Sequence, residues 1–172
     1  TLLLGNRDLN KMRLTSELHC SQFSPAILPN LPGPKWVPRG PKHITPEAHC
    51  RKLAAARLEV QPAEVPAEEL QRVNTVAERL RYIYKETMGA QGELERRIRE
   101  LDEIEAGGGD MRKLCGVEHR AVTEQEDMAW SNQEGEKVER AAASVIRSVA
   151  AGGWMREYLE VPSPSPSPSP SP

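Results

Sequence analysis

The feature that most constrains this chain is a periodic run of apolar residues between Leu70 and Leu101. Successive members are alternately three and four residues apart, which is the repeat of helices that pair in coiled coils. The positions are Leu70, Val73, Ala77, Leu80, Tyr84, Thr87, Gln91, Leu94, Ile98 and Leu101, and only Thr87 and Gln91 are polar. The register predicts one helix from Pro66 to Ala106, either continuous or kinked at Gly89 and Gly92.

A helix of that length would extend for roughly 60 Å. The rest of the chain offers little to cover it, since apolar residues are 38% and aromatic residues 4% of the 172 residues. We therefore expect the apolar face to bind a partner protein. Its partner-binding members, called the seam here, are Leu70, Val73, Leu80, Tyr84, Leu94, Ile98 and Leu101.

The helical region 45–106 also contains a shorter predicted helix ahead of the seam. Thr45 is a favourable N-cap and Pro46 a favourable first helical residue, and Pro62 and Pro66 prevent the helix from continuing. This helix is predicted from Pro46 to about Glu59.

A second helical region is predicted over residues 107–161. The stretch AAASVIRSVAAGG, from Ala141 to Gly153, keeps the spacing of three and four with small side chains, so its backbone can approach another helix closely. Gly152 and Gly153 are predicted to end this helix. Trp154, with Tyr158 and Leu159, is interpreted as an aromatic anchor that binds a partner. The predicted fold class is mainly α.

Residues 1–44 are predicted to form an extended docking arm. Six prolines between Pro25 and Pro41 exclude helix and central strand. The arm holds six Lys and Arg against two Asp and Glu, a balance of +4 in a chain of net charge −2. Trp36 has no local core to enter, so we expect it to anchor the arm in a partner pocket. Lys35, Arg39 and Lys42 would direct it to an acidic protein surface.

The last segment, residues 162–172, is a low-complexity Ser-Pro repeat. Such a repeat is extended and cannot build a core, and it is an expected substrate for proline-directed kinases. No apolar run approaches the ~20 residues that a bilayer requires, so no membrane span is expected. The first residue is Thr1 rather than Met, which favours a matured organellar protein or a fragment.

No catalytic or metal site is predicted. Cys115 and His119, four residues apart, are the best candidate pair of zinc ligands, but no C-x2-C pair accompanies them. Residues 106–110, AGGGD, lack the Lys and Ser or Thr of a phosphate-binding loop. We therefore expect no enzyme activity, no cofactor and no metal.

The sequence as a whole predicts a non-catalytic structural or accessory subunit of a large multiprotein assembly. Such architectures resemble accessory subunits of mitochondrial complexes and ribosomes, and proteins inside ciliary microtubules. One alternative is a coiled-coil adaptor or homo-oligomer with a phosphorylatable tail, and another is an RNA-contacting ribosomal-type subunit. The acidic balance makes nucleic acid the less favoured partner. The expected location is intracellular, first mitochondrial and alternatively the cilium or cytoskeleton.

Overall fold

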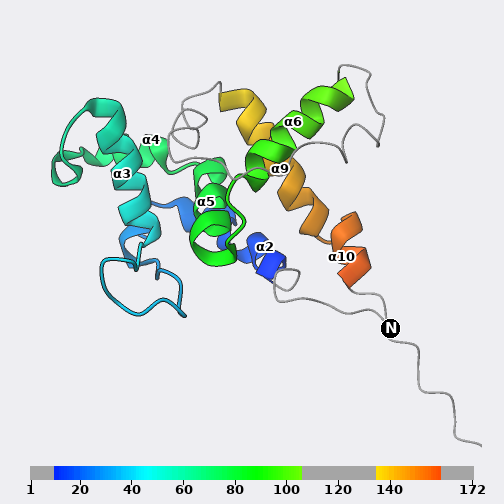
Figure 1. Cartoon of the computed structure of the whole chain (residues 1–172), viewed down its shortest axis with the longest axis horizontal. Coiled ribbons are helices and arrows are strands. Elements are labelled where there is room, and N and C mark those ends of the chain that lie inside the picture. The colour runs from blue at the N-terminus through cyan, green and yellow to red at the C-terminus, as the bar shows by residue number, and fades with distance from the viewer. Residues whose placement is uncertain (1–9, 106–134, 160–172) are drawn as a thin grey trace, which may run out of the picture.

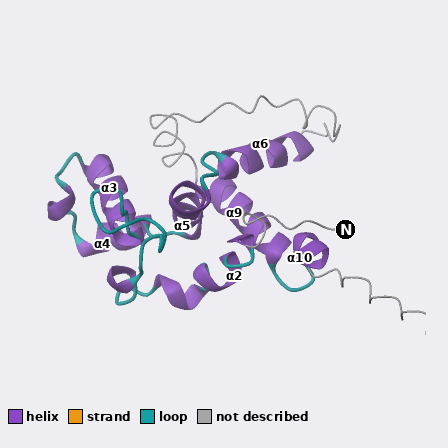
Figure 2. Cartoon of the chain, turned by 60° about the horizontal axis from the view of Figure 1, so that its bottom comes forward, coloured by secondary structure: helices purple, strands orange, loops and turns teal. Residues whose placement is uncertain are grey.

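The computed structural model describes residues 10–105 and 135–159, and helices make up most of them (Figure 1). The predicted mainly-α fold is confirmed, and no strand occurs in these two ranges. Figure 2 shows that loops connect the helices, and residues 31–45 form a long one ahead of α3. The α-helices are α2 (Leu14–Glu17), α3 (Pro46–Leu58), α4 (Ala67–Val73), α5 (Val76–Tyr82), α6 (Glu93–Glu105), α9 (Gly135–Val149) and α10 (Trp154–Leu159). Shorter turns are η1 (Cys20–Phe23), η2 (Leu28–Asn30) and η3 (Pro62–Glu64), and a π-helix, η4 (Ile83–Met88), follows α5.

Helix α3 begins and ends as its sequence predicts. The Thr45 side chain accepts a hydrogen bond from the Ala48 backbone N–H at 3.2 Å, and Pro46 is the first helical residue. Glu59 follows the helix in the left-handed region, with φ of 56°. The prediction of a helix from Pro46 to about Glu59 is thus confirmed.

The single helix predicted from Pro66 to Ala106 is wrong. The chain forms α4, α5 and α6 instead, with η4 continuing α5. The first break follows Val73, where Thr75 caps α5 by accepting from the Glu78 backbone N–H at 3.3 Å. The second break contains Gly89 and Gly92, with φ of 59° and 81°, values that glycine adopts without steric cost.

The larger core lies where α9 packs against α5 and α6 (Figure 1). Ala141 and Ala142 are completely buried there, and their small side chains allow the helix backbones to approach closely. Buried members of this core include Leu80, Tyr84, Leu94, Ile98, Val138 and Val149. The expectation that the chain is too small to cover its own seam is therefore wrong, because α9 covers much of it.

A smaller core lies between α3 and α4. It contains Cys50, Ala54, Val65, Leu70 and Val73, and Leu28 contributes from the N-terminal segment. The N-terminal part of the seam is therefore buried as well, in a separate cluster from the C-terminal part.

Much of the N-terminal segment belongs to the folded body, which corrects the prediction that residues 1–44 are only an extended arm. Leu14 and Leu18 are buried in the larger core and Leu28 in the smaller one. Two side chains hold the η1 turn in place: Arg79 Nη2 donates to the Gln22 carbonyl and Gln71 Nε2 to the Phe23 carbonyl, each at 2.9 Å.

Three charged side chains are buried between α5 and α6. Arg81 donates from Nη1 to Glu78 Oε1 at 2.6 Å and from Nε to Glu95 Oε1 at 2.7 Å. This network is not apparent from the sequence, because charged side chains beside an apolar helix face are usually exposed to solvent.

Within the described ranges, no helix combines the length and the apolar character needed to cross a membrane. The Ser-Pro tail and the Cys115/His119 pair lie outside the described residues, as do residues 1–9 and 106–134.

Candidate functional site

The feature best suited to binding is a loop between η2 and α3, residues 33–43, called the Trp36 loop here. It lies below α3 at the left of Figure 1. Trp36 is 55% exposed, which is unusual for so large an apolar side chain. The Arg13 guanidinium lies over its ring, 5.9 Å from the centroid, and supports it from the side of α2.

Hydrogen bonds within the loop fix its shape. The Val37 N–H donates to the Pro34 carbonyl at 3.1 Å, and the His43 N–H donates to the Gly40 carbonyl at 2.9 Å. The His43 ring joins these two turns, because its Nδ1 lies 2.9 Å from the Val37 carbonyl. Since a carbonyl can only accept, Nδ1 carries the hydrogen in this contact.

Gly33 allows the His43 ring to lie against the backbone. A Cβ atom at this position would come within 2.5 Å of His43 Nε2, closer than two non-bonded heavy atoms can approach. Glycine is therefore required at position 33 for the imidazole to bridge the loop. The loop is preorganised, so a partner would not have to order it on binding.

The predicted cations of this region all lie on the Trp36 loop. Lys35, Arg39 and Lys42 are exposed, and none of them forms an ion pair with another residue in the described part of the chain. The range 33–43 holds no acidic residue. The structure thus brings Trp36 and three uncompensated positive charges onto one short loop.

The seam residues lie elsewhere, inside the molecule. Leu70, Val73, Leu80, Tyr84, Leu94 and Ile98 are buried within the chain, and Leu101 is half-buried against the larger core. They stabilise the fold, and a partner could contact them only if the cores opened.

Trp154 is 65% exposed on α10, which lies on the opposite side of Figure 1 from the Trp36 loop. Gly153 sets the start of this helix, since a Cβ there would lie 2.2 Å from the Arg147 carbonyl oxygen. The predicted end of the preceding helix near the two glycines is confirmed, as α9 ends at Val149.

A buried polar cluster lies between α3 and α5, and its thiol is poorly suited to nucleophilic catalysis or metal binding. Tyr82 donates to the Ile44 carbonyl at 3.0 Å, and its ring lies 5.6 Å from the His49 ring. Burial lowers the pKa of His49 to about 4 and raises the pKa of the adjacent Cys50 thiol to about 12. A thiol held in its protonated form is a poor nucleophile and a poor metal ligand.

The described histidines, cysteines and acidic residues do not group into a metal site. In residues 10–105 and 135–159, no three His, Cys, Asp or Glu side chains are placed to share an ion. Cys20 Sγ lies 3.9 Å from Nδ1 of His19, with no third ligand grouped with them in these ranges. The expectation of no metal stays a prediction, since Cys115 and His119 lie outside the described residues.

Trp36 and its cations can be identified from the sequence, but the residues that support Trp36 and fix the loop cannot. Nothing in the sequence distinguishes Gly33 and His43 from the surrounding Pro-rich residues. Arg13 stands out only as one of the six cations of residues 1–44. The contacts of Gly33 and His43 join residues six to ten apart in an irregular loop, and Arg13 precedes Trp36 by 23 residues. No helix or strand period predicts such pairs.

Comparison with known proteins finds no family model, no curated protein and no solved structure that matches the chain significantly.

Proposed function

We propose that the protein is a non-catalytic subunit of a multiprotein assembly, and that it docks the Trp36 loop onto an acidic surface of a neighbouring protein. The observation that carries the proposal is the combination of an exposed Trp36 with Lys35, Arg39 and Lys42 on a loop held rigid by His43. The mainly buried seam supports the same assignment, because its side chains are occupied within the chain while Trp36 and the three cations stay exposed.

The physical argument rests on the cost of binding. A tryptophan that enters a partner pocket is among the most common energetic anchors of protein interfaces. Two turns and the His43 bridge already restrict the loop, so less conformational entropy is lost when it docks. The three cations would accelerate encounter with an acidic partner and fix the orientation of docking.

The two alternatives lose support for different reasons. A coiled-coil homo-oligomer requires the seam to be free for pairing, whereas six of its seven members are buried within the chain. An RNA-contacting subunit requires many phosphate contacts, and three cations on a single loop release few counterions. We propose neither alternative. The cellular location stays an expectation from the sequence.

The test is size fractionation of a native lysate, followed by amine crosslinking and mass spectrometry of the fraction that holds this chain. We expect migration with a large particle and crosslinks from Lys35 and Lys42 to acidic segments of another protein. Trp36→Ala should release the chain from the particle, whereas Leu58→Ala, at another exposed apolar side chain, should not.

A second variant separates electrostatics from packing. Replacing Lys35, Arg39 and Lys42 together by Glu should slow association, and the slowing should shrink as salt is raised. Migration of the wild-type chain as a small species with only self-crosslinks would overturn the proposal. Crosslinks to RNA that disappear with salt would favour the nucleic-acid alternative instead.

A further inference from the structure

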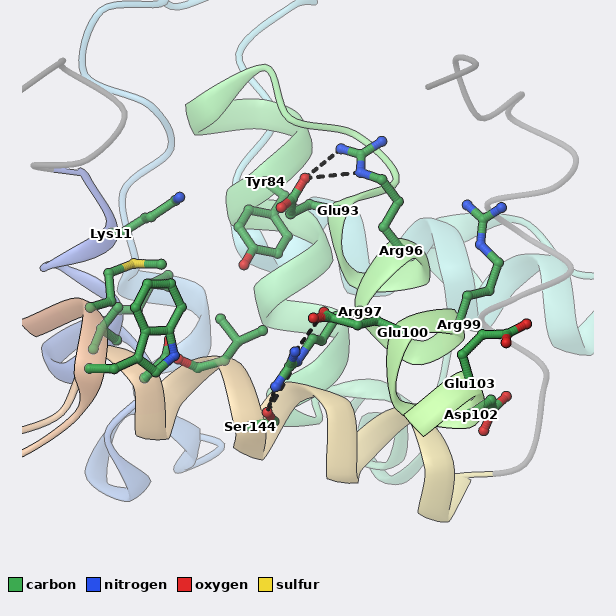
Figure 3. A pocket seen from close by; sticks show the side chains of 16 residues that line it. Lys11, Tyr84, Glu93, Arg96, Arg97, Arg99, Glu100, Asp102, Glu103 and Ser144 are labelled. Atoms are coloured by element: carbon green, nitrogen blue, oxygen red, sulfur yellow. Dashed lines mark hydrogen bonds and ion pairs between the residues drawn. The ribbon is translucent and has the colours of Figure 1, made fainter. Parts of the chain in front are cut away.

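A cleft of about 910 Å³ opens beside the larger core, between the N-terminal segment and helices α6, α9 and α10 (Figure 3). Its volume lies within the range of sites that hold small molecules, roughly 300–1,000 Å³. The cleft is distinct from the Trp36 loop, and none of its lining residues belongs to that loop.

The two ends of the cleft differ in chemistry. One end is lined by apolar side chains from three helices, namely Leu14, Val145, Val149, Trp154 and Met155. Charged side chains of α6 line the rest of the cleft. Figure 3 shows Glu93 and Arg96 beside Tyr84, and Arg99, Asp102 and Glu103 on the side away from Lys11. A ligand that fills the cleft therefore needs an apolar body.

Tyr84 places a polar group at the wall of the apolar end. Its side chain is only 4% exposed, and Figure 3 shows its hydroxyl pointing into the cavity on the side of Lys11. Within the described ranges, no residue forms a hydrogen bond with this hydroxyl. By contrast, the hydroxyl of Tyr82, two residues earlier, donates to the Ile44 carbonyl. A hydroxyl that opens onto a cavity and has no partner in the described chain is available to a ligand.

Lys11 supplies the positive charge at this end. It lines the cleft just ahead of α2 and forms no ion pair with another described residue. The neighbouring Arg97 is already engaged, since its Nη1 donates to Glu100 Oε2 at 2.6 Å and its Nε donates to the Ser144 hydroxyl at 3.1 Å. The four acidic side chains that line the cleft, Glu93, Glu100, Asp102 and Glu103, all belong to α6.

We propose that this cleft binds a small amphipathic carboxylate. Its apolar body would lie on the half-buried Val145 and Met155 and beside the exposed Trp154. Its carboxylate would accept a hydrogen bond from the Tyr84 hydroxyl and pair with the Lys11 ammonium. An amphiphilic quaternary ammonium would lack both interactions, because the Lys11 ammonium repels it and it can neither accept a hydrogen bond from the Tyr84 hydroxyl nor donate one to it.

The experiment titrates dodecanoate, below its micellar concentration, into the full-length protein by isothermal calorimetry. We expect saturable binding of one molecule per chain. Tyr84→Phe and Lys11→Ala should each weaken it by roughly ten- to hundredfold, as expected for a lost hydrogen bond to a charged group. The matched controls Tyr82→Phe and Lys35→Ala should bind as the wild type does.

Val145→Trp provides a second variant, because the larger side chain occupies the cleft from α9. It should abolish binding while the circular dichroism spectrum stays helical. Dodecyltrimethylammonium of the same chain length should bind at least tenfold more weakly than dodecanoate. Equal affinities for the two amphiphiles would overturn the proposal, and so would non-saturable uptake that is identical in all variants.

Discussion

Arg81 and Glu95 form an ion pair in the interior of the protein, with Arg81 Nε donating to Glu95 Oε1 at 2.7 Å. The pair connects α5 to α6 across the break that contains Gly89 and Gly92. Their side chains are 4% and 2% exposed, so water contributes little to solvating either charge. The Glu95 charge is therefore stabilised mainly by Arg81, which also pairs with Glu78, and the network fixes how α6 follows the π-helix.

Removing one member of this pair should be costly. Glu95→Ala leaves the buried Arg81 with less compensation and should lower the free energy of unfolding by about 3–5 kcal/mol, as measured by urea denaturation. Glu93→Ala is the control, because its pair with Arg96 is partly exposed and should contribute at most about 1 kcal/mol. Equal losses in the two variants would show that the buried pair has no special role.

Two neighbouring tyrosines should respond differently to loss of their hydroxyls. Tyr82→Phe removes the hydrogen bond to the Ile44 carbonyl at 3.0 Å and should destabilise the fold by about 1 kcal/mol. Tyr84→Phe removes a hydroxyl that has no partner among the described residues, so the change should stay within about 0.5 kcal/mol. Denaturation of both variants at pH 7 tests this, and a larger loss for Tyr84→Phe would contradict it.

The protein should lose stability as the pH falls through the range in which histidine titrates. Burial, followed by the positive charge of Lys85, lowers the pKa of His49 from 6.5 to about 4. The unfolded chain therefore binds a proton at pH 5 that the folded chain does not, which costs about 2 kcal/mol at that pH. This stability is complete above pH 6.5 and declines toward pH 4.

Unfolding free energies measured at pH 7.5 and pH 5 check this prediction. His49→Phe keeps a ring beside Tyr82 and removes the titrating group, so the difference between the two pH values should shrink. His19→Gln is the control, because His19 is exposed and should leave the difference unchanged. A wild-type difference that His49→Phe does not alter would assign the effect to other groups.

The two described cysteines should react with thiol reagents at very different rates. Cys20 is exposed, whereas Cys50 is buried and its pKa is raised to about 12. In a Cys115→Ser background, Ellman's reagent should modify Cys20 quickly. Cys50 should react roughly a thousandfold more slowly, because the core must open first. In this background, Cys20→Ser leaves only Cys50 to react and Cys50→Ser leaves only Cys20. Comparable reaction rates of these two proteins would show that α3 does not shield Cys50.

Local signals in the sequence predicted the helix ends well. Thr45 and Pro46 predicted the start of α3, and the two glycines after Ala151 predicted the end of α9. The apolar spacing also identified which side chains of residues 70–98 are buried. These features are short-range, since a cap or a helix face depends on residues within one or two turns.

One signal for the broken helix was present but overlooked. Thr75 and Glu78 have the spacing of an N-cap and its third helical residue, which marks a helix start in the middle of the apolar run. The heptad spacing hid this break, because the same side of the chain stays buried across it. A preserved apolar period therefore predicts a buried face, but it does not predict whether the helix is continuous.

The rest depends on contacts between distant residues. Nothing in the spacing of residues 135–149 indicates that α9 packs on α5 and α6 of its own chain rather than on another protein. Similarly, the burial of Arg81 and Glu95 depends on α6 turning back after Gly92. Burial of the seam, and with it the correct choice of binding surface, could not be predicted without the tertiary arrangement.

The packing of α2 against α9 has a consequence for how the chain is made. Leu14 and Leu18 share a core with Val138 and Ala142, which are synthesised near the other end of the chain. The N-terminal leucines therefore leave the ribosome long before the helix that buries them, and contacts between such distant segments form slowly. A translation product that stops short of α9 would keep both leucines uncovered, and we expect such a product to aggregate.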